Sequence, residues 1–95
     1  MRNLLAFDLG ASNGRAILGQ FDGEKITMRE LHRFENNYIE MNGVFYWDLP
    51  YLYNQLKQGL LAFKNANVGE LDCIGIDTWG VDYGLLDKNG QLLSN

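Results

Sequence analysis

Residues 8–15 read Asp8-Leu9-Gly10-Ala11-Ser12-Asn13-Gly14-Arg15, an acidic residue that closes an apolar run and a turn of small residues behind it. The run Leu4–Phe7 predicts a strand inside a sheet, buried on both faces. Gly10–Gly14 predicts a turn, and Arg15–Phe21 predicts a second strand that returns beside the first. The chain therefore opens with a β-hairpin over residues 4–21.

The turn of this hairpin has the composition of a phosphate-binding loop. A tight turn of small residues can direct successive backbone N–H groups into one concavity, which suits phosphate oxygens. Gly10 and Gly14 would permit unusual backbone dihedrals and close approach of a ligand, while Ser12 and Asn13 add side-chain donors. The same residues fit a plain β-hairpin equally well. The pattern is not a Walker loop, because Gly-Lys-Ser/Thr is missing, nor a dinucleotide fingerprint, because a strand follows.

Two charged residues flank the turn. A carboxylate does not bind phosphate directly, so Asp8 would act through Mg²⁺ and its waters. Arg15 could offset the charge that develops on a phosphoryl group during transfer. The sequence thus predicts that the amides of residues 10–14 face the phosphates of a nucleotide, with a metal ion beside Asp8.

Turn signals and hydrophobic periodicity predict the next elements. Asp22-Gly23 leads into a third strand over residues 25–34, and Asn42-Gly43 joins two short aromatic-rich strands. Asp48 is expected to cap a helix that carries Pro50 in its first turn and ends at residues 67–69. The helix presents an apolar stripe formed by Leu49, Leu52, Tyr53, Leu56, Leu60 and Phe63. Gly59 should weaken it by about 1 kcal/mol relative to Ala.

A strand over residues 71–76 and a hairpin of residues 81–86 and 91–93 complete the predicted order. Cys73 is the single cysteine, and in its apolar segment it is expected to be a buried small hydrophobe. His32 is expected to be structural, because no catalytic partner lies near it in sequence. One helix cannot cover both faces of a sheet, so we expect the chain to be part of a larger α/β domain.

A second candidate site lies at the end of the later strand, where residues 76–82 read Ile-Asp-Thr-Trp-Gly-Val-Asp. Ligands of open α/β sheets bind beyond the carboxyl ends of the strands. Polar groups beside an aromatic ring suit a sugar, so Thr78, Trp79 and Gly80 are candidate sugar-binding residues. The alternative is that Trp79 packs in the core and Asp77 caps a turn.

Composition excludes several classes of protein. With 46% hydrophobic and 21% charged residues, the chain is globular rather than disordered. Its net charge of −4 and scattered basic residues argue against nucleic acid as a partner. No apolar stretch has the length of a membrane span or the pattern of a signal peptide. A cytoplasmic protein with no membrane partner is expected, and the lone cysteine fits a reducing compartment.

Taken together, Phe7–Arg15, Leu31–Phe34, Asn42-Gly43, Trp47-Asp48 and Ile74–Tyr83 resemble the N-terminal segment of the FGGY carbohydrate kinases. The opening motif resembles that of the wider actin-like ATPase superfamily and so specifies ATP but no sugar. The segment Asp-Thr-Trp-Gly-Val-Asp is similar to the rhamnulokinase branch of the family. Other branches carry Gln-Met-His or Arg-Glu at this place.

The resemblance implies a ribonuclease-H-like (actin-like ATPase) α/β fold, with residues 1–95 as the N-terminal part of the first kinase domain. The rest of that domain and the second domain would lie in a C-terminal remainder. It also implies ATP- and Mg²⁺-dependent phosphorylation of the 1-hydroxyl of L-rhamnulose, in L-rhamnose catabolism. Carried over by position, Ala11–Arg15 would contact the ATP phosphates, Asp8 would organise the metal and Gly80 would contact the sugar.

No catalytic residue is expected within the chain. In the family that it resembles, the general-base Asp and the adenine-binding residues lie downstream, so the 95 residues alone should be inactive. Other keto-sugar kinases of the family, xylulokinase-like or fuculokinase-like, remain alternatives. So do a regulator that binds sugar or nucleotide without catalysis and a ribonuclease-H-like nuclease. The nuclease would need several carboxylates around two metals, of which Asp77 could be one.

Overall fold

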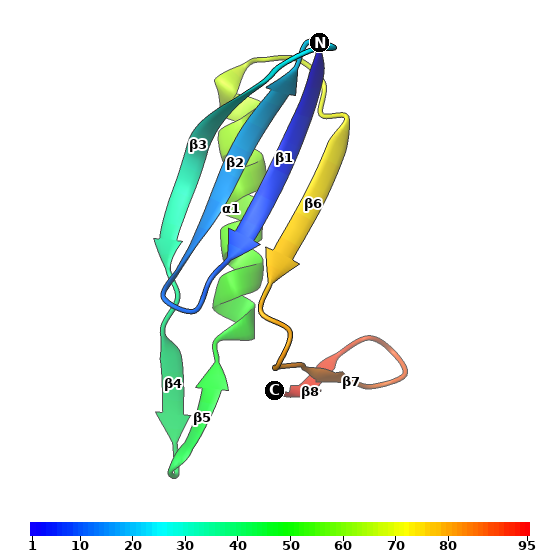
Figure 1. Ribbon diagram of the computed structural model, residues 1–95. Coiled ribbons are helices and arrows are strands. Elements are labelled where there is room, and N and C mark those ends of the chain that lie inside the picture. Colours follow the sequence, from blue (N-terminus) through cyan, green and yellow to red (C-terminus); the bar gives the residue numbers. More distant parts are fainter.

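The computed structural model describes residues 1–95 and consists of a four-stranded sheet with one helix lying along one face (Figure 1). The sheet contains β1 (Arg2–Leu9), β2 (Asn13–Phe21), β3 (Ile26–Glu35) and β6 (Cys73–Thr78), in the order β3-β2-β1-β6. Neighbouring strands among β1, β2 and β3 are antiparallel, whereas β6 runs parallel to β1. The connection between these parallel strands contains the helix, as parallel pairing requires a long crossover.

Tight turns occur where the sequence predicts them. Between β2 and β3, Gly23 has a φ of 103° and the Asp22 carboxylate accepts two backbone amides of the turn. A small ribbon follows, composed of β4 (Tyr38–Met41) and β5 (Val44–Trp47). Asn42 and Gly43 join its strands with φ of 53° and 77°, the two left-handed residues of a type I′ turn. Both predicted turns are confirmed.

The helix α1 (Leu49–Ala66) begins and ends as its sequence predicts. The Asp48 carboxylate accepts the Tyr51 amide at 3.2 Å and caps the first turn. Asn67 adopts the left-handed conformation, and its amide donates to the Lys64 carbonyl at 3.3 Å. Local sequence therefore sets both ends of the helix.

The core lies between α1 and one face of the sheet, and its buried members are Leu5, Phe7, Ala16, Leu18 and Phe63. Gly59 marks the closest approach of the helix to the sheet. A Cβ atom there would lie 2.4 Å from Cε1 of Phe7 and 3.0 Å from Cβ of Ala16. The glycine that weakens the isolated helix is thus the residue that lets the helix dock.

Two expectations about burial are wrong, and both fail for one reason. Ala6 is exposed between the buried Leu5 and Phe7, so β1 is buried on one face only. Cys73 is exposed, and so are all the remaining residues of β6. The cause is that the single helix covers one face of β1, β2 and β3, which leaves the opposite face of the sheet and the whole of β6 uncovered.

The apolar stripe of the helix is narrower than predicted, for the same reason. Leu52 and Phe63 are buried, whereas Tyr53 is 63% exposed and Leu60 40% exposed. The single sheet covers only the central line of the stripe along the helix, and the residues to the side of that line stay exposed.

Two polar side chains fix the helix and its connection to the sheet. His32 on β3 shares a hydrogen bond of 2.6 Å with Gln55 on α1, which fits its predicted structural role. Asn3 is 5% exposed, and its Nδ2 donates to the carbonyls of Val68 and Glu70 in the segment that leads into β6. The start of β1 therefore anchors the α1–β6 connection.

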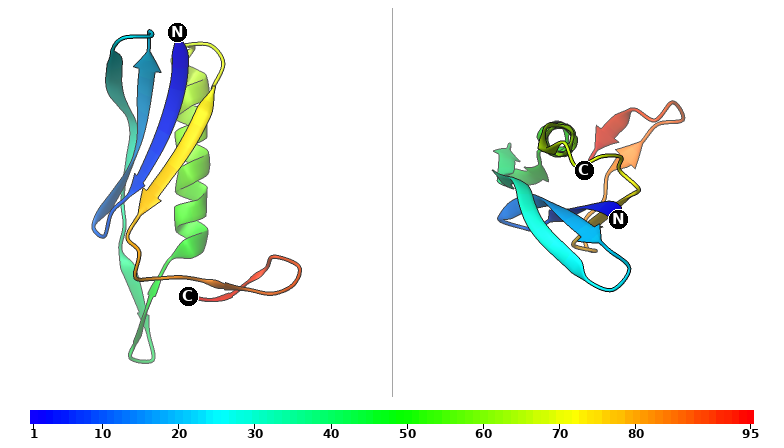
Figure 2. Two further views of the ribbon diagram at one scale, coloured as in Figure 1. Left: turned by 45° about the vertical axis from the view of Figure 1, so that its right-hand side comes forward. Right: turned by 90° about the horizontal axis from the view of Figure 1, so that it is seen from above.

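One end of the molecule gathers the carboxyl ends of β1 and β6, the β4–β5 ribbon, the start of α1 and the closing hairpin (lower end of Figure 1 and of the left view in Figure 2). That hairpin comprises β7 (Leu85–Leu86) and β8 (Leu92–Ser94) and projects sideways from the body (Figure 2). The order of elements agrees with the predicted one. No helix in the structure combines the length and apolar character that crossing a membrane requires.

Candidate functional site

The loop between β1 and β2 is shorter than predicted, because β2 already begins at Asn13. The Gly10 amide donates to the Asn13 carbonyl at 2.9 Å and closes the turn. The amides of Ala11 and Ser12 donate to no acceptor in the protein, and both residues are exposed. The free donors are thus concentrated at the tip of the loop rather than spread over residues 10–14.

The two glycines of the loop serve packing, and the expectation that they adopt unusual dihedrals is wrong. Neither Gly10 nor Gly14 has a positive φ. A Cβ at Gly14 would lie 2.1 Å from Cζ of Phe34, so the glycine makes room for the aromatic ring. A Cβ at Gly10 would lie 2.8 Å from the Asn13 carbonyl oxygen, inside the turn itself.

Asn36 supports the loop from the end of β3 and was not singled out from the sequence. Its Nδ2 donates to the Gly10 carbonyl at 2.8 Å, and its amide donates to the Ser12 carbonyl at 3.0 Å. The residue is only 3% exposed, and its Oδ1 is buried without a hydrogen-bond partner. The loop therefore rests on a buried amide side chain on the side opposite to its exposed tip.

Asp8 and Arg15, proposed for metal and phosphate, are paired with each other. They occupy facing positions on β1 and β2, and Nη2 of Arg15 lies 2.8 Å from Oδ2 of Asp8. Asp77 stands at the matching position of β6, so the three residues form a row across neighbouring strands. The structure contains no cluster of three or more metal-ligating side chains. The further carboxylates that the nuclease alternative needs are therefore not found here.

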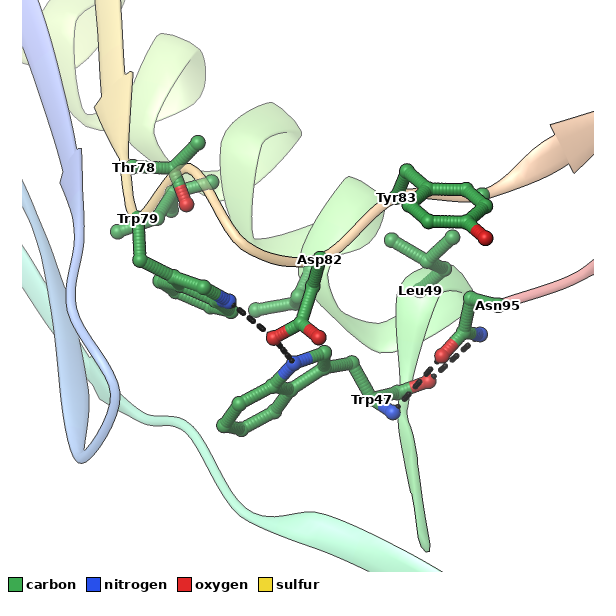
Figure 3. Close-up of a pocket in the computed structure, with 10 residues that line it drawn as sticks. Trp47, Leu49, Thr78, Trp79, Asp82, Tyr83 and Asn95 are labelled. Carbon is green, nitrogen blue, oxygen red and sulfur yellow. Dashed lines mark hydrogen bonds between the residues drawn. The ribbon is translucent and has the colours of Figure 1, made fainter.

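A pocket of about 170 Å³ lies beside the loop, between the sheet and the first turn of α1 (Figure 3). It is lined by Leu9, Trp47, Leu49, Leu52, Thr78, Trp79, Asp82, Tyr83, Gly84 and Asn95. Thr78 and Trp79, two of the three predicted sugar-binding residues, are among them. Gly80, the third, is not, and space around it is open.

Two indole rings and one carboxylate form the wall of this pocket (Figure 3). The rings of Trp47 and Trp79 lie 4.7 Å apart between centroids, at an angle of 55°. Both Nε1 atoms donate to the same oxygen of Asp82, at 2.8 Å and 2.5 Å respectively. These bonds, that from Trp47 first, lower the pKa of the Asp82 carboxyl below its usual value of 3.8. Trp79 is half-buried against Trp47 and is not part of the core between α1 and the sheet.

Trp47 and Asp82 are the two polar or aromatic residues of the pocket wall described above that the sequence analysis did not select as sugar-binding. Asp82 closes the quoted segment 76–82, so a signal for it existed. Trp47 ends β5, and the Asn95 side chain holds its backbone by accepting the Trp47 amide and donating to the Trp47 carbonyl. No local pattern places a residue of the ribbon beside Trp79, because the contact depends on how separate elements meet.

Comparison with known proteins gives relatives by sequence, although no family model matches the chain. The chain is 48% identical over 93 residues to a rhamnulokinase of Mannheimia succiniciproducens, covering 96% of this chain and 19% of that protein. It is 48% identical over 94 residues to a rhamnulokinase of Bacteroides thetaiotaomicron, covering 97% and 19%. A rhamnulokinase of Halalkalibacterium halodurans is 44% identical over 95 residues, covering 100% and 20%. The chain thus spans about a fifth of the length of these relatives.

Comparison of structures shows the fold. A ligand-bound xylulose kinase from Lactobacillus acidophilus superposes with a TM-score of 0.78 over 100% of this chain and 19% of that chain. Its sequence is 14% identical, so the likeness concerns the fold alone. The predicted fold class, a partial α/β domain of the actin-like ATPase type, is confirmed. Together with the matches to rhamnulokinases, this identifies the chain as a rhamnulokinase-like segment of the FGGY carbohydrate kinase family.

Proposed function

We propose that the chain is the phosphate-binding and sugar-facing part of an ATP-dependent carbohydrate kinase that phosphorylates the 1-hydroxyl of L-rhamnulose. The proposal rests on one observation, which is that the loop with the free amides and the aromatic-walled pocket lie at the same edge of the sheet. Leu9 ends β1, lines the aromatic pocket and directly precedes the loop with the free amides. Thr78 ends β6 in register with it. Ligands of such sheets bind beyond the carboxyl ends of the strands, at this same edge.

On the nucleotide side, the exposed tip of the loop would receive the phosphates. The amides of Ala11 and Ser12 and the side chains of Ser12 and Asn13 are the proposed donors. Asp8 would hold Mg²⁺ through water, and Arg15, already beside it, would balance the phosphate charge. When bound, the metal ion neutralises charge on the phosphates. Gly10 and Gly14 leave no room for a side chain, the first inside the turn and the second against the ring of Phe34, so substitution at either would disturb the loop.

On the sugar side, the pocket combines the chemistry that sugars require. Ring faces of Trp47 and Trp79 suit the C–H face of a sugar, and hydrogen-bonding groups suit its hydroxyls. Oδ1 of Asp82 makes no hydrogen bond within the protein and is available to accept one from a hydroxyl. Thr78 and the backbone of Gly80 would add further polar contacts. The names of the relatives that match this chain favour rhamnulose among the ketoses.

In the proposed reaction the 1-hydroxyl oxygen of the sugar bonds to the γ-phosphorus of ATP. The bond from that phosphorus to the bridging oxygen breaks, ADP leaves with this oxygen, and the hydroxyl proton passes to a general base. We assign the base to an Asp in a C-terminal remainder, with the adenine site, the rest of the first domain and a second domain. Positioning supplies most of the rate in phosphoryl transfer, so the chain alone should be inactive.

The test is ADP release measured with ATP, Mg²⁺ and a panel of ketoses for the full-length protein that carries this chain. We expect kcat/KM for L-rhamnulose to exceed that for L-fuculose and D-xylulose by about tenfold or more. The isolated 95-residue chain should release no ADP above background. Preference for another ketose would reassign the substrate, and no turnover with any of them would refute the kinase proposal.

A further inference from the structure

Asn36 touches the loop at two points, and both contacts are made to carbonyl groups. Its Nδ2 donates to the Gly10 carbonyl at 2.8 Å, and its amide donates to the Ser12 carbonyl at 3.0 Å. Because Asn36 is 3% exposed, it draws both carbonyls toward the interior of the protein. The two contacts therefore fix two of the peptide planes that make up the loop.

The orientation of these planes determines where the loop amides point. In a trans peptide the carbonyl and the N–H of one plane point in opposite directions, and the chain contains no cis peptide bond. The Gly10 carbonyl shares its plane with the Ala11 amide, and the Ser12 carbonyl shares its plane with the Asn13 amide. Both amides are consequently turned away from Asn36, and of the two the Ala11 amide lies at the exposed tip of the loop, without an acceptor in the protein.

We propose that Asn36 is a positioning residue for phosphate binding, whose side chain holds the Ala11 amide toward the phosphate tail of a nucleotide. This inference rests on the proposed function, since it concerns the same loop. A second observation supports it. Oδ1 of Asn36 is buried without a partner, an arrangement that costs stability and that a residue retained only for packing would not need.

The structure offers matched variants for a test. Asn36→Asp keeps the shape of the side chain but replaces the donor to the Gly10 carbonyl by an acceptor. Asn36→Ala removes the donor without adding charge. It is the second variant, to be used if the buried carboxylate of Asn36→Asp prevents folding. Asn37→Asp is the control, because it adds the same charge one residue further on, where the side chain is exposed and bonds only to Glu35.

The measurement is the affinity of the full-length protein for ATP and for adenosine, which lacks phosphates, by calorimetry on variants whose thermal melting shows that they are folded. We expect the Asn36 variants to bind ATP about tenfold more weakly, the factor that one hydrogen bond supplies, with adenosine affinity unchanged. Asn37→Asp should match the parent protein for both ligands.

Two results would overturn the inference while leaving the proposed function in place. One is an equal loss of ATP and adenosine affinity in the Asn36 variants, which would mean a general structural role. The other is unchanged ATP affinity in a folded Asn36 variant. A parent protein that binds ATP no more tightly than adenosine would instead refute the phosphate-loop proposal itself, and the inference with it.

Discussion

At the scale of single residues, Gly59 shows how packing can outweigh helix propensity. Gly59→Ala should favour the isolated helix by about 1 kcal/mol. Its Cβ, however, would lie 2.4 Å from the ring of Phe7, which is 2% exposed and cannot move aside cheaply. Overpacking a core costs about 1–3 kcal/mol, so we expect a net loss of stability in urea unfolding. Gly75→Ala is the control, since no atom lies within 4 Å of its Cβ, and a higher midpoint for Gly59→Ala would contradict the packing argument.

Asp82 supplies a second prediction at this scale, because the only two tryptophans of the chain donate to its carboxylate. Its pKa is lowered in the folded state, so the contribution of these bonds is present above the unfolded pKa and is lost as the pH falls through the lower, folded one. Tryptophan emission should therefore change in a transition centred below pH 3.8.

Two variants test the assignment of that transition. Asp82→Asn should abolish it, because the amide does not titrate. Asp22→Asn should leave it intact, although the pKa of Asp22 is also lowered, since backbone amides of a distant turn are the cause there. A transition that survives in Asp82→Asn would show that another group governs the fluorescence of the two indoles.

At the scale of elements, Asn3 couples β1 to the segment between α1 and β6. Its Nδ2 donates to the carbonyls of Val68 and Glu70, and its Oδ1 accepts from Gln20. Asn3→Ala should lower the free energy of unfolding by about 2–4 kcal/mol, because it leaves several buried polar groups without partners. Denaturant unfolding measures this, with the exposed helix residue Asn54→Ala as control. Equal midpoints for the two variants would mean that water replaces Asn3 at little cost.

The element scale also explains which sequence predictions were reliable. Strand pairs joined by Asp22-Gly23 and Asn42-Gly43, and a helix bounded by Asp48 and Asn67, depend on contacts within a few residues, so the sequence alone sufficed for them. Burial in β6 was predicted wrongly because it depends on what covers the strand. Cys73 and its neighbours are exposed since the single helix packs over the other three strands.

At the scale of the whole molecule, the chain is extended and thinly packed. Its radius of gyration is 15.5 Å, against about 12 Å for a compact domain of this length. Its accessible surface is 6988 Å², against about 5500 Å² for a compact protein of this mass. These values agree with a chain that spans about a fifth of the length of its relatives.

Exposed apolar surface on a strand whose outer edge is unpaired leads to a prediction about association. Ile74 and Ile76 are 47% and 58% exposed on β6, which forms an edge of the sheet. The isolated chain should therefore self-associate with rising concentration, and Ile74→Lys with Ile76→Lys should reduce this. Light scattering after size exclusion measures the mass. Asn54→Lys with Gln58→Lys, which adds the same charge at exposed polar residues of α1, is the control, and equal suppression by it would point to net charge as the cause.

The sequence by itself determined the order of the elements, their turns and caps, the fold class and the two segments that carry the candidate sites. The elements, turns and caps follow from residue types at short spacing, which act on the backbone wherever the rest of the chain lies, whereas the fold class was implied by the resemblance to a known family. Only the tertiary structure decided that Trp47 joins Trp79 and Asp82 in one pocket, that Asn36 lies beneath the loop, and that β6 stays uncovered. Such contacts join residues from separate elements, and their geometry comes from packing, on which no local sequence pattern reports.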